Sequence, residues 1–363
     1  MVAAGSRRAP GPCRRLSETS PAIARKRFRS LKRRLQINEE TFPHNRLRAA
    51  ISAWRFIGAN LTILGWIHQG FKIPFISTPP PFDMGNSRFE GAALKQWEET
   101  LPHYLRLGAL RPASYSSHVS WAFMIPKPDG TLRLIIDLRP LNAYIEDRRM
   151  KMQTLRDLEF NVHRGDWMVS WDIADAYFHV ALRPEQVRFC TIRVNGRLWE
   201  LPVLPFGLKS SPYVFTKVMK PFLNFLRSPR LVCPRPPPPH WSGLRALWRL
   251  NLILYLLSYL DDFLGVHKNR FILATWTHHL RQALHDLGIS LKEEKSVLNP
   301  VQGLKELGLW VDSHKGRFEV PWTKVQAIQT AAHTLLAIAS HQARWFSQNS
   351  LPGFLDKLKR SLG

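Results

Sequence analysis

The chain has 363 residues, of which 45% are hydrophobic, and it includes 13 Trp and 20 Phe. This composition excludes a wholly disordered polypeptide, and 27 Pro without a repeat exclude a fibre. The 52 Lys and Arg outnumber the 27 Asp and Glu, so the net charge of +25 indicates a polyanionic partner, above all nucleic acid. No stretch reaches the roughly 18 apolar residues of a membrane helix. Three Cys without paired spacing indicate no disulfide framework or zinc site, and we expect a reducing, intracellular compartment.

The N-terminal residues are strongly basic. Residues 1–36 contain eleven Lys or Arg and a single acid, Glu18. Because their Ala, Pro, Ser and Arg composition cannot build a core, we expect residues 1–41 to form a basic disordered tail. The run Arg25–Arg34 is typical of a nucleic-acid patch or a nuclear-import signal, so the nucleus and the cytoplasm are both expected locations. A merely solvated tail and a mitochondrial transit peptide are the alternatives.

Ordered structure is expected from Phe42 onward. Trp and aliphatic residues follow at helical spacing up to Gly70, and a second helical period runs over residues 94–105. Two β-rich runs, Trp121–Ile125 and Leu132–Ile136, flank the tripeptide Pro-Asp-Gly. Turn residues between two such runs predict a β-hairpin.

Further strands and a helix are predicted in the middle of the chain. Met168–Ile173 is an apolar run that contains a carboxylate near its end. The runs Phe189–Val194 and Arg197–Leu201 flank the dipeptide Asn-Gly, which is the strongest short hairpin signal. Ser211 followed by Pro212 predicts an N-cap and the first turn of a helix.

A proline-rich stretch interrupts this pattern. The four prolines Pro236–Pro239 lack backbone N–H donors, so we expect residues 232–250 to be an insert loop that bulges from the fold. Beyond it, the runs Leu256–Tyr259 and Phe263–His267 predict a hairpin, and a helix is expected to end at Gly288. Hairpins mixed with helices favour an α+β architecture with an antiparallel sheet over a doubly wound parallel sheet.

Three carboxylates stand at the edges of these strand-like runs: Asp172, Asp261 and Asp262. Buried there, they must be paired, solvated or bound to metal. If their strands share one sheet, the carboxylates supply the hard oxygen ligands that Mg²⁺ prefers, and two such ions promote in-line phosphoryl transfer. On spacing alone, a solvated turn is the simpler interpretation.

An ordered series of motifs resembles that of reverse transcriptases over roughly residues 42–325. The motifs are the fingers hairpin Ile125–Arg133 with Asp137–Asn142, the first catalytic motif Trp171–Phe178, the template and nucleotide loop Leu204–Pro212, the catalytic turn Tyr259–Asp262 (YLDD), the late palm motif Leu287–Ser290 with Glu294–Ser296, and the primer-grip hairpin Glu306–Asp312. The details around residues 176–180 and 70–75 most resemble retrotransposons that carry a tyrosine recombinase, the DIRS-like group.

The resemblance implies a fold and an activity. The expected fold is α+β, a right-hand polymerase with fingers and palm over residues 42–320 and a partial thumb or connection over 321–363. The expected activity is RNA-directed DNA polymerisation, in which dNTPs are added to a primer 3′-hydroxyl on an RNA or DNA template with Mg²⁺, or alternatively Mn²⁺. A catalytically inactive, retroelement-derived nucleic-acid-binding protein is the rival, favoured by the unusual insert and the short C-terminus.

The resemblance also implies the role of individual residues. Asp172, Asp261 and Asp262 are expected to be catalytic and to bind two metal ions, with the Ile173 carbonyl as a further ligand. The residues expected to bind the incoming nucleotide are Lys127 and Arg133 on the fingers, Asp175 and Ala176 through their backbone amides, Tyr177 beneath the sugar, Phe206 and Gly207 in the pocket wall, and Lys295 as a general acid. The bulky ring of Tyr177 would exclude a 2′-hydroxyl.

Overall fold

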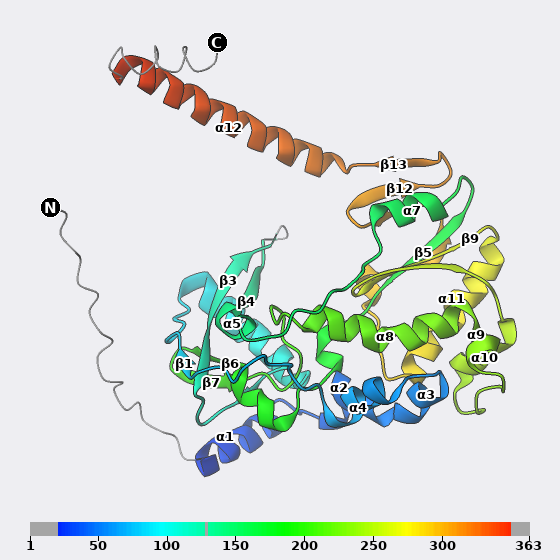
Figure 1. Ribbon diagram of the computed structural model, residues 1–363, viewed down its shortest axis with the longest axis horizontal. Helices are drawn as coiled ribbons and strands as arrows, with labels where there is room; N and C mark the ends of the chain where they lie inside the picture. Colours follow the sequence, from blue (N-terminus) through cyan, green and yellow to red (C-terminus); the bar gives the residue numbers. More distant parts are fainter. Residues whose placement is uncertain (1–20, 128–129, 350–363) are drawn as a thin grey trace.

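The computed structural model describes residues 21–127 and 130–349 of the chain (Figure 1). The first twenty residues of the predicted tail, the hairpin-turn residues Pro128 and Asp129, and residues 350–363 of the predicted thumb lie outside this described part. Within it, the strands form a six-stranded, a four-stranded and a three-stranded sheet. None of the helices in this described part is both long enough and apolar enough to cross a membrane.

The prediction of a disordered tail is wrong for residues 21–41. A helix, α1 (Pro21–Arg34), and a short 3₁₀ turn, η1 (Glu39–Thr41), occupy this segment. Leu31 and Leu35, one helical turn apart, pack against the hydrophobic core. Two leucines among so many cations do not stand out in a composition, although they suffice to attach one face of a helix to the core.

The helices predicted after Phe42 are confirmed. They are α2 (Pro43–Ala49), α3 (Ile51–Phe56), α4 (Leu61–Gln69), which ends at Gly70, and α5 (Gly91–Arg106). The Trp54 indole of α3 is fully buried and donates a hydrogen bond to the Leu287 carbonyl at 2.9 Å, 233 positions later in the chain. This bond attaches the first helices to the far end of the fold.

The six-stranded sheet contains the two hairpins predicted around Pro128–Gly130 and around Asn195-Gly196. Its strands are β1 (Phe82–Asp83), β2 (Arg111–Pro112), β3 (His118–Pro126), β4 (Leu132–Asp137), β6 (Thr191–Val194) and β7 (Arg197–Glu200). β3 pairs with β4 and β6 pairs with β7, each antiparallel, whereas β1 and β6 run parallel to β3. The sheet is therefore mixed, as α+β folds allow.

The four-stranded sheet is entirely antiparallel. It contains the hairpin predicted from the runs Leu256–Tyr259 and Phe263–His267. Its order is β10 (Val297–Val301), β5 (Trp167–Asp172), β9 (Asp262–His267) and β8 (Tyr255–Tyr259). Side chains alternate between the two faces of such a sheet. On one face, Trp171 stacks on Phe263 with ring centroids 5.5 Å apart, and Trp276 of the covering helix lies 5.6 Å from Trp171.

Two helices cover this aromatic face, and a helix with a three-stranded sheet covers the other face. The helices are α8 (Ser211–Arg227), whose apolar side is buried as predicted, and α11 (Arg270–Asp286). Ser210 rather than Ser211 occupies the N-cap position of α8. The opposite face contacts α7 (Leu155–Asn161) and the three-stranded sheet of β11 (Gly303–Glu306), β12 (Leu309–Asp312) and β13 (Arg317–Glu319). A short helix, α6 (Arg139–Asn142), follows β4.

The prediction that residues 232–250 bulge from the fold as a loop is wrong. Helix α9 (Pro229–Val232) precedes the prolines, and helix α10 (Ser242–Leu250) follows them and packs against α11. The approach is so close that a Cβ on Gly243 would lie 2.1 Å from the Ala283 backbone nitrogen. Leu244 is fully buried. The prolines correctly indicate an irregular stretch. The leucines that follow them have helical spacing, which the loop prediction did not take into account.

The last described element is α12 (Trp322–Asn349), which extends away from the sheets (Figure 1). Several of its large apolar side chains are exposed, among them Trp322, Ile328 and Leu335. The assignment of this helix to a thumb stays a prediction.

Candidate active site

The three predicted carboxylates lie together at one end of the four-stranded sheet. Asp172 is the last residue of β5 and stands directly opposite Asp262, the first residue of β9. Asp261 is in the two-residue turn between β8 and β9, and its carbonyl accepts a hydrogen bond from the Ile173 N–H at 3.1 Å. The backbone thus joins the two segments that carry the carboxylates.

The backbone around these carboxylates is strained at three points. Leu260, which precedes Asp261 in the turn, has φ +56°, Asp175 has φ +49°, and Leu307 in the β11–β12 turn has φ +46°. Non-glycine residues in this left-handed region cost of order 1–3 kcal/mol each and concentrate at functional sites. Six non-glycine residues of the described part have positive φ, and half of them therefore surround this one site.

A cleft of about 1110 Å³ opens over Asp172 and Asp262. Alternation along β5 and β9 places Asp172 and Asp262 on the same face as Met168 and Leu264, the face that the three-stranded sheet covers. The residues that line the cleft include Gln153, Ser170, Asp172, Tyr259, Asp262, Lys295, Lys305, Glu306 and Lys324. Carboxylates and ammonium groups therefore share one solvent-filled space.

The carboxylates repel one another. Removal from water, together with the charge of Asp261, raises the pKa of Asp172. The same two causes, with a contribution from Asp172, raise the pKa of Asp262 to about 6. Lys295 acts in the opposite direction on both groups. Such repulsion is relieved when a cation lies among the oxygens.

The donor set fits a hard divalent cation that brings other ligands with it. No group of three or more His, Cys, Asp or Glu in residues 21–127 and 130–349 is arranged to hold a metal ion by itself. Mg²⁺ does not require such a cage, because it binds through one or two carboxylates and completes its shell with water and substrate phosphates. The close, mutually repelling pair Asp172 and Asp262 satisfies that requirement.

Lys295 is held beside the carboxylates by a loop that is attached to β5. The Lys292 N–H donates to the Asp172 carbonyl at 2.8 Å, and the Ser296 hydroxyl accepts from the Asp172 N–H at 3.1 Å. These bonds fix the 3₁₀ turn η4 (Glu293–Lys295) against the end of the strand. The structure therefore brings Lys295 to the site that the sequence assigned to it.

Glu306 is a fourth carboxyl group at the cleft, and our sequence-based assignment gave it no role. Its residue is 6% exposed, and burial together with the Asp262 charge raises its pKa to about 7. Leu304, two residues earlier in β11, is buried on the same face. A charged residue two positions from a buried leucine on one strand is the signal that could have found it.

In the metal-free protein, Glu306→Gln is expected to raise stability relative to the parent more at pH 8 than at pH 5. The folded pKa of about 7 exceeds the ordinary value of 4.5, so the parent loses stability as pH rises through this window. The difference is at most about 3 kcal/mol, at about 1.4 kcal/mol per pKa unit. Thermal unfolding at both pH values measures it, with exposed Glu319→Gln as the control. Equal pH profiles for Glu306→Gln and the parent would contradict the prediction.

Tyr177 stands between the carboxylates and an aromatic group. It belongs to η2 (Ala176–His179), which begins directly after the left-handed Asp175. The Tyr177 ring lies 4.9 Å from the Phe206 ring, and burial together with the Asp261 charge raises the Tyr177 pKa to about 12. Phe206 itself is 53% exposed. The structure thus places Asp175, Ala176, Tyr177 and Phe206 in one group beside Asp261.

Gly207 requires its glycine. Its φ is +92°, and a Cβ there would lie 3.1 Å from the Ile136 carbonyl oxygen of β4. The Asn142 amide donates to the Gly207 carbonyl at 2.8 Å and accepts from the Lys209 N–H at 2.9 Å. These contacts connect the 204–212 loop to β4 of the six-stranded sheet and to α6, which follows it.

The two predicted fingers cations differ in their surroundings. Arg133 and Asp175 both act on Tyr104 of α5, whose pKa is raised by burial and by Asp175 and lowered by Arg133. Arg133 therefore lies on the same side as the Asp175 loop. The Lys127 side chain makes no hydrogen bond or ion pair with the described residues, and no contact connects it to the carboxylates.

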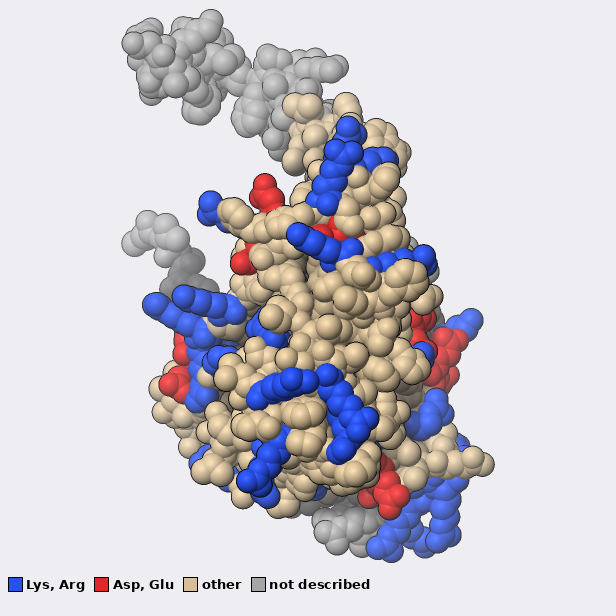
Figure 2. All heavy atoms as spheres, turned by 90° about the vertical axis from the view of Figure 1, so that its right-hand side faces the viewer, with Lys and Arg blue, Asp and Glu red and all other residues tan. Residues whose placement is uncertain are grey.

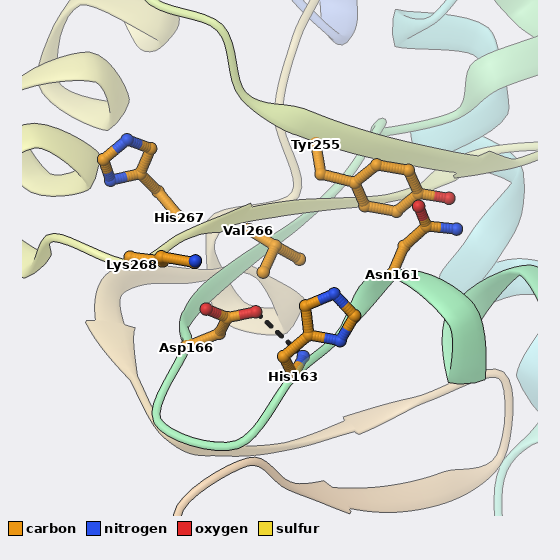
Figure 3. Close-up of a pocket in the computed structure, with 7 residues that line it drawn as sticks. All are labelled: Asn161, His163, Asp166, Tyr255, Val266, His267 and Lys268. Carbon is orange, nitrogen blue, oxygen red and sulfur yellow. Dashed lines mark hydrogen bonds between the residues drawn. The ribbon is translucent and has the colours of Figure 1, made fainter.

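A smaller pocket of about 460 Å³ lies at the other end of the same strands (Figure 3). Its lining residues are Asn161, His163, Asp166, Tyr255, Val266, His267 and Lys268. The His163 N–H donates to the buried Asp166 carboxylate at 2.8 Å. None of these residues was predicted from the sequence to be functional, and the pocket is separated from the carboxylates by the length of β5.

The described residues have the right-hand architecture that reverse transcriptase structures share. A family model described as "Reverse transcriptase (RNA-dependent DNA polymerase)" matches residues 125–311, more than half of the chain. The chain belongs to this family. The matched segment contains all three predicted catalytic carboxylates.

The chain spans only part of the length of the relatives that it matches. Transposon Tf2-3 and Tf2-4 polyproteins of Schizosaccharomyces pombe are 24% identical over 165 residues, which is 46% of this chain and 12% of each polyprotein. The native prototype foamy virus protease-reverse transcriptase has a TM-score of 0.51 and 20% identity over 67% of this chain and 29% of that one. The foamy viral enzyme in complex with dsDNA has a TM-score of 0.53 and 14% identity over 85% and 65%. These structures share the fold.

Proposed function

We propose that the chain is an RNA-directed DNA polymerase that adds dNTPs to a primer 3′-hydroxyl on an RNA or DNA template. The observation that carries the proposal is the opposed pair Asp172 and Asp262, which line a cleft, with Asp261 in the adjoining β8–β9 turn. Family membership supports the same reaction. Structures of the foamy viral enzyme with dsDNA and with RNA/DNA hybrid are consistent with a template-primer as the occupant.

In this proposal the carboxylates hold the metal ions. Asp172, Asp261 and Asp262 bind Mg²⁺, or Mn²⁺ in its place, with the Ile173 carbonyl as a further ligand. The chemistry that bound metal supplies is activation of the primer hydroxyl and neutralisation of charge on the pyrophosphate leaving group. The mutual repulsion of the carboxylates favours binding of a cation, because it disappears when the charge is neutralised.

Other side chains bind and orient the nucleotide. Arg133 and Lys127 bind the triphosphate from the fingers hairpin, and the amides of Asp175 and Ala176 face it from the palm. Gly207 and Phe206 form the pocket wall. Lys295, whose charge already acts on Asp172 and Asp262, donates a proton to the pyrophosphate.

One of the arguments for the rival, an inactive nucleic-acid-binding protein, treats the unusual insert as a sign of decay. The insert is instead folded against α11, so that one argument no longer applies. We propose a retrotransposon origin, which agrees with the transposon polyproteins among its relatives. The DIRS-like subgroup and the nuclear or cytoplasmic location rest on the sequence alone and stay predictions.

Primer extension tests the proposed activity. The chain is expected to extend oligo(dT) on poly(rA) with dTTP and Mg²⁺, and chelation of the metal is expected to stop the reaction. Mn²⁺ should restore extension. A purified, folded chain that binds the template-primer but extends it with neither metal would favour the rival.

Tyr177→Ala is expected to raise the incorporation of ribonucleotides relative to deoxynucleotides by about ten- to a hundredfold, because steric rejection of one hydroxyl has this size. The readout is the fraction of alkali-labile bonds in the product. The control is Tyr115→Ala, because Tyr115 is exposed and lies outside the cleft. An unchanged sugar ratio would make Tyr177 a packing residue, in contact with Phe206 and Phe215.

A further inference from the structure

One long segment of the chain has no acidic residue. Between Glu200 and Asp261 there is no Asp or Glu, whereas eight Lys and Arg occur there. The segment that contains α9 and α10 carries five of them, which we call the α9–α10 surface: Arg227, Arg230, Arg235, Arg245 and Arg249. Local acids therefore cannot compensate its charge.

Acids from other elements do not compensate it either. None of the five arginines forms an ion pair with any residue of the described chain, whereas Arg193 pairs with Asp83 at 2.8 Å. The acid packed against α10 is Asp286 of α11, and its carboxylate accepts the Gly243 and Leu244 N–H groups at 3.0 and 3.1 Å. Asp286 thus caps the start of the helix.

Three of the guanidinium groups are held in place by backbone carbonyls. Arg227 donates to Leu256 at 3.0 Å, Arg230 to Arg249 at 3.4 Å, and Arg245 to Pro237 at 2.7 Å. Each such bond uses one of the five N–H donors of an arginine. The remaining donors are presented at fixed positions, which lowers the entropy cost of binding an anion.

The α9–α10 surface lies on the side of the palm away from the cleft. α10 packs on α11, which covers the Trp171 and Phe263 face of the four-stranded sheet, whereas Asp172 and Asp262 are on the opposite face. No described residue of α9 or α10 lines the cleft. Figure 2 looks onto the side that carries α9 and α10 and shows Lys and Arg across its middle, with Asp and Glu toward its margins.

We propose that the α9–α10 surface binds the phosphate backbone of nucleic acid outside the polymerase cleft. Unpaired guanidinium groups, three of them held by backbone carbonyls, match the geometry of phosphate oxygens, and a polyanion gains affinity by releasing counterions at each contact. Binding through phosphates reads no sequence. The surface thus retains template or product while the cleft acts on the primer end. This binding does not require polymerisation.

The test is the salt dependence of binding by the double variant Arg235→Gln/Arg249→Gln. Neither side chain makes a hydrogen bond within the described structure, so the fold is expected to persist. Fluorescence anisotropy with a labelled RNA/DNA hybrid is measured from 50 to 200 mM salt. The slope of log affinity against log salt is about 0.9 per phosphate contact. Loss of two contacts should therefore make the fall in affinity between 50 and 200 mM salt about 12-fold smaller than in the parent.

The matched control is Arg281→Gln/Lys315→Gln, which removes the same net charge from two cations that already pair with Glu293 and Asp312. It should leave the salt dependence close to that of the parent. Equal changes of the salt dependence in both double variants would mean that net charge alone causes the effect, which would overturn the proposal. An unchanged slope in Arg235→Gln/Arg249→Gln would also overturn it and leave the surface to an acidic protein. Extension at saturating template should be unchanged, so the outcome is independent of the proposed activity.

Discussion

Asp261→Asn is expected to lower the rate of primer extension by about a thousandfold or more while leaving template-primer affinity nearly unchanged. The amide keeps the shape of the side chain and removes one of the anionic oxygens that hold the metal. A loss of about 4 kcal/mol of transition-state stabilisation corresponds to this factor, at 1.36 kcal/mol per tenfold. Affinity is expected to persist because contacts from Lys and Arg to phosphates dominate it.

Single-turnover extension and anisotropy on the same preparation separate the two effects. Asp147→Asn is the control, because Asp147 is exposed and its ion pair with Lys209 lies on the surface, where such pairs contribute little. The fold of Asp261→Asn should be intact, since the Asp261 carbonyl that binds the Ile173 N–H is retained. Extension at the parent rate would remove Asp261 from the metal site.

Replacing residues 234–250 by a short Gly/Ser linker is expected to unfold the protein. The replacement uncovers α11, removes the fully buried Leu244 and Leu247, and leaves the Asp286 carboxylate without its two N–H donors. Deleting one buried leucine side chain already costs about 2–5 kcal/mol. Domains are stable by only about 5–15 kcal/mol in total, so loss of the whole helix exceeds what the fold tolerates.

A point variant gives the graded form of this test. Leu244→Ala should lower the free energy of unfolding by about 2–5 kcal/mol in chemical denaturation. The same change at Leu231, which is 84% exposed on α9, should alter it by less than about 0.5 kcal/mol. Equal stabilities of Leu244→Ala and Leu231→Ala, or a folded and active linker variant, would restore the loop interpretation of the insert.

Local signals account for what the sequence predicted well. Turn dipeptides such as Asn195-Gly196, which has positive φ at both residues, fix hairpins from adjacent residues alone. The period of α8 and α11 places their apolar sides correctly. The grouping of Asp172 with Asp262 was expected from the order of motifs that resembles reverse transcriptases, and the strands that carry them, β5 and β9, are neighbours in the sheet.

Contacts between distant segments account for what was missed. Whether α1 is ordered depends on Leu31 and Leu35 finding a surface elsewhere in the chain. The role of α10 depends on the backbone of α11 at Ala283. Glu306 becomes a site residue only because β11 folds over the face that carries Asp262. None of these partners is close in sequence, so propensity and periodicity carry no signal for them.

The bond from Trp54 to the Leu287 carbonyl has a consequence for how the protein folds. It joins residues 233 positions apart, so the core around the first helices cannot close until α11 has left the ribosome. Closing so long a loop costs entropy before any contact compensates it, which slows folding. During synthesis the side of α3 that carries Trp54 lacks this partner until residue 287 has been made. Chaperone dependence is therefore a property expected of this topology.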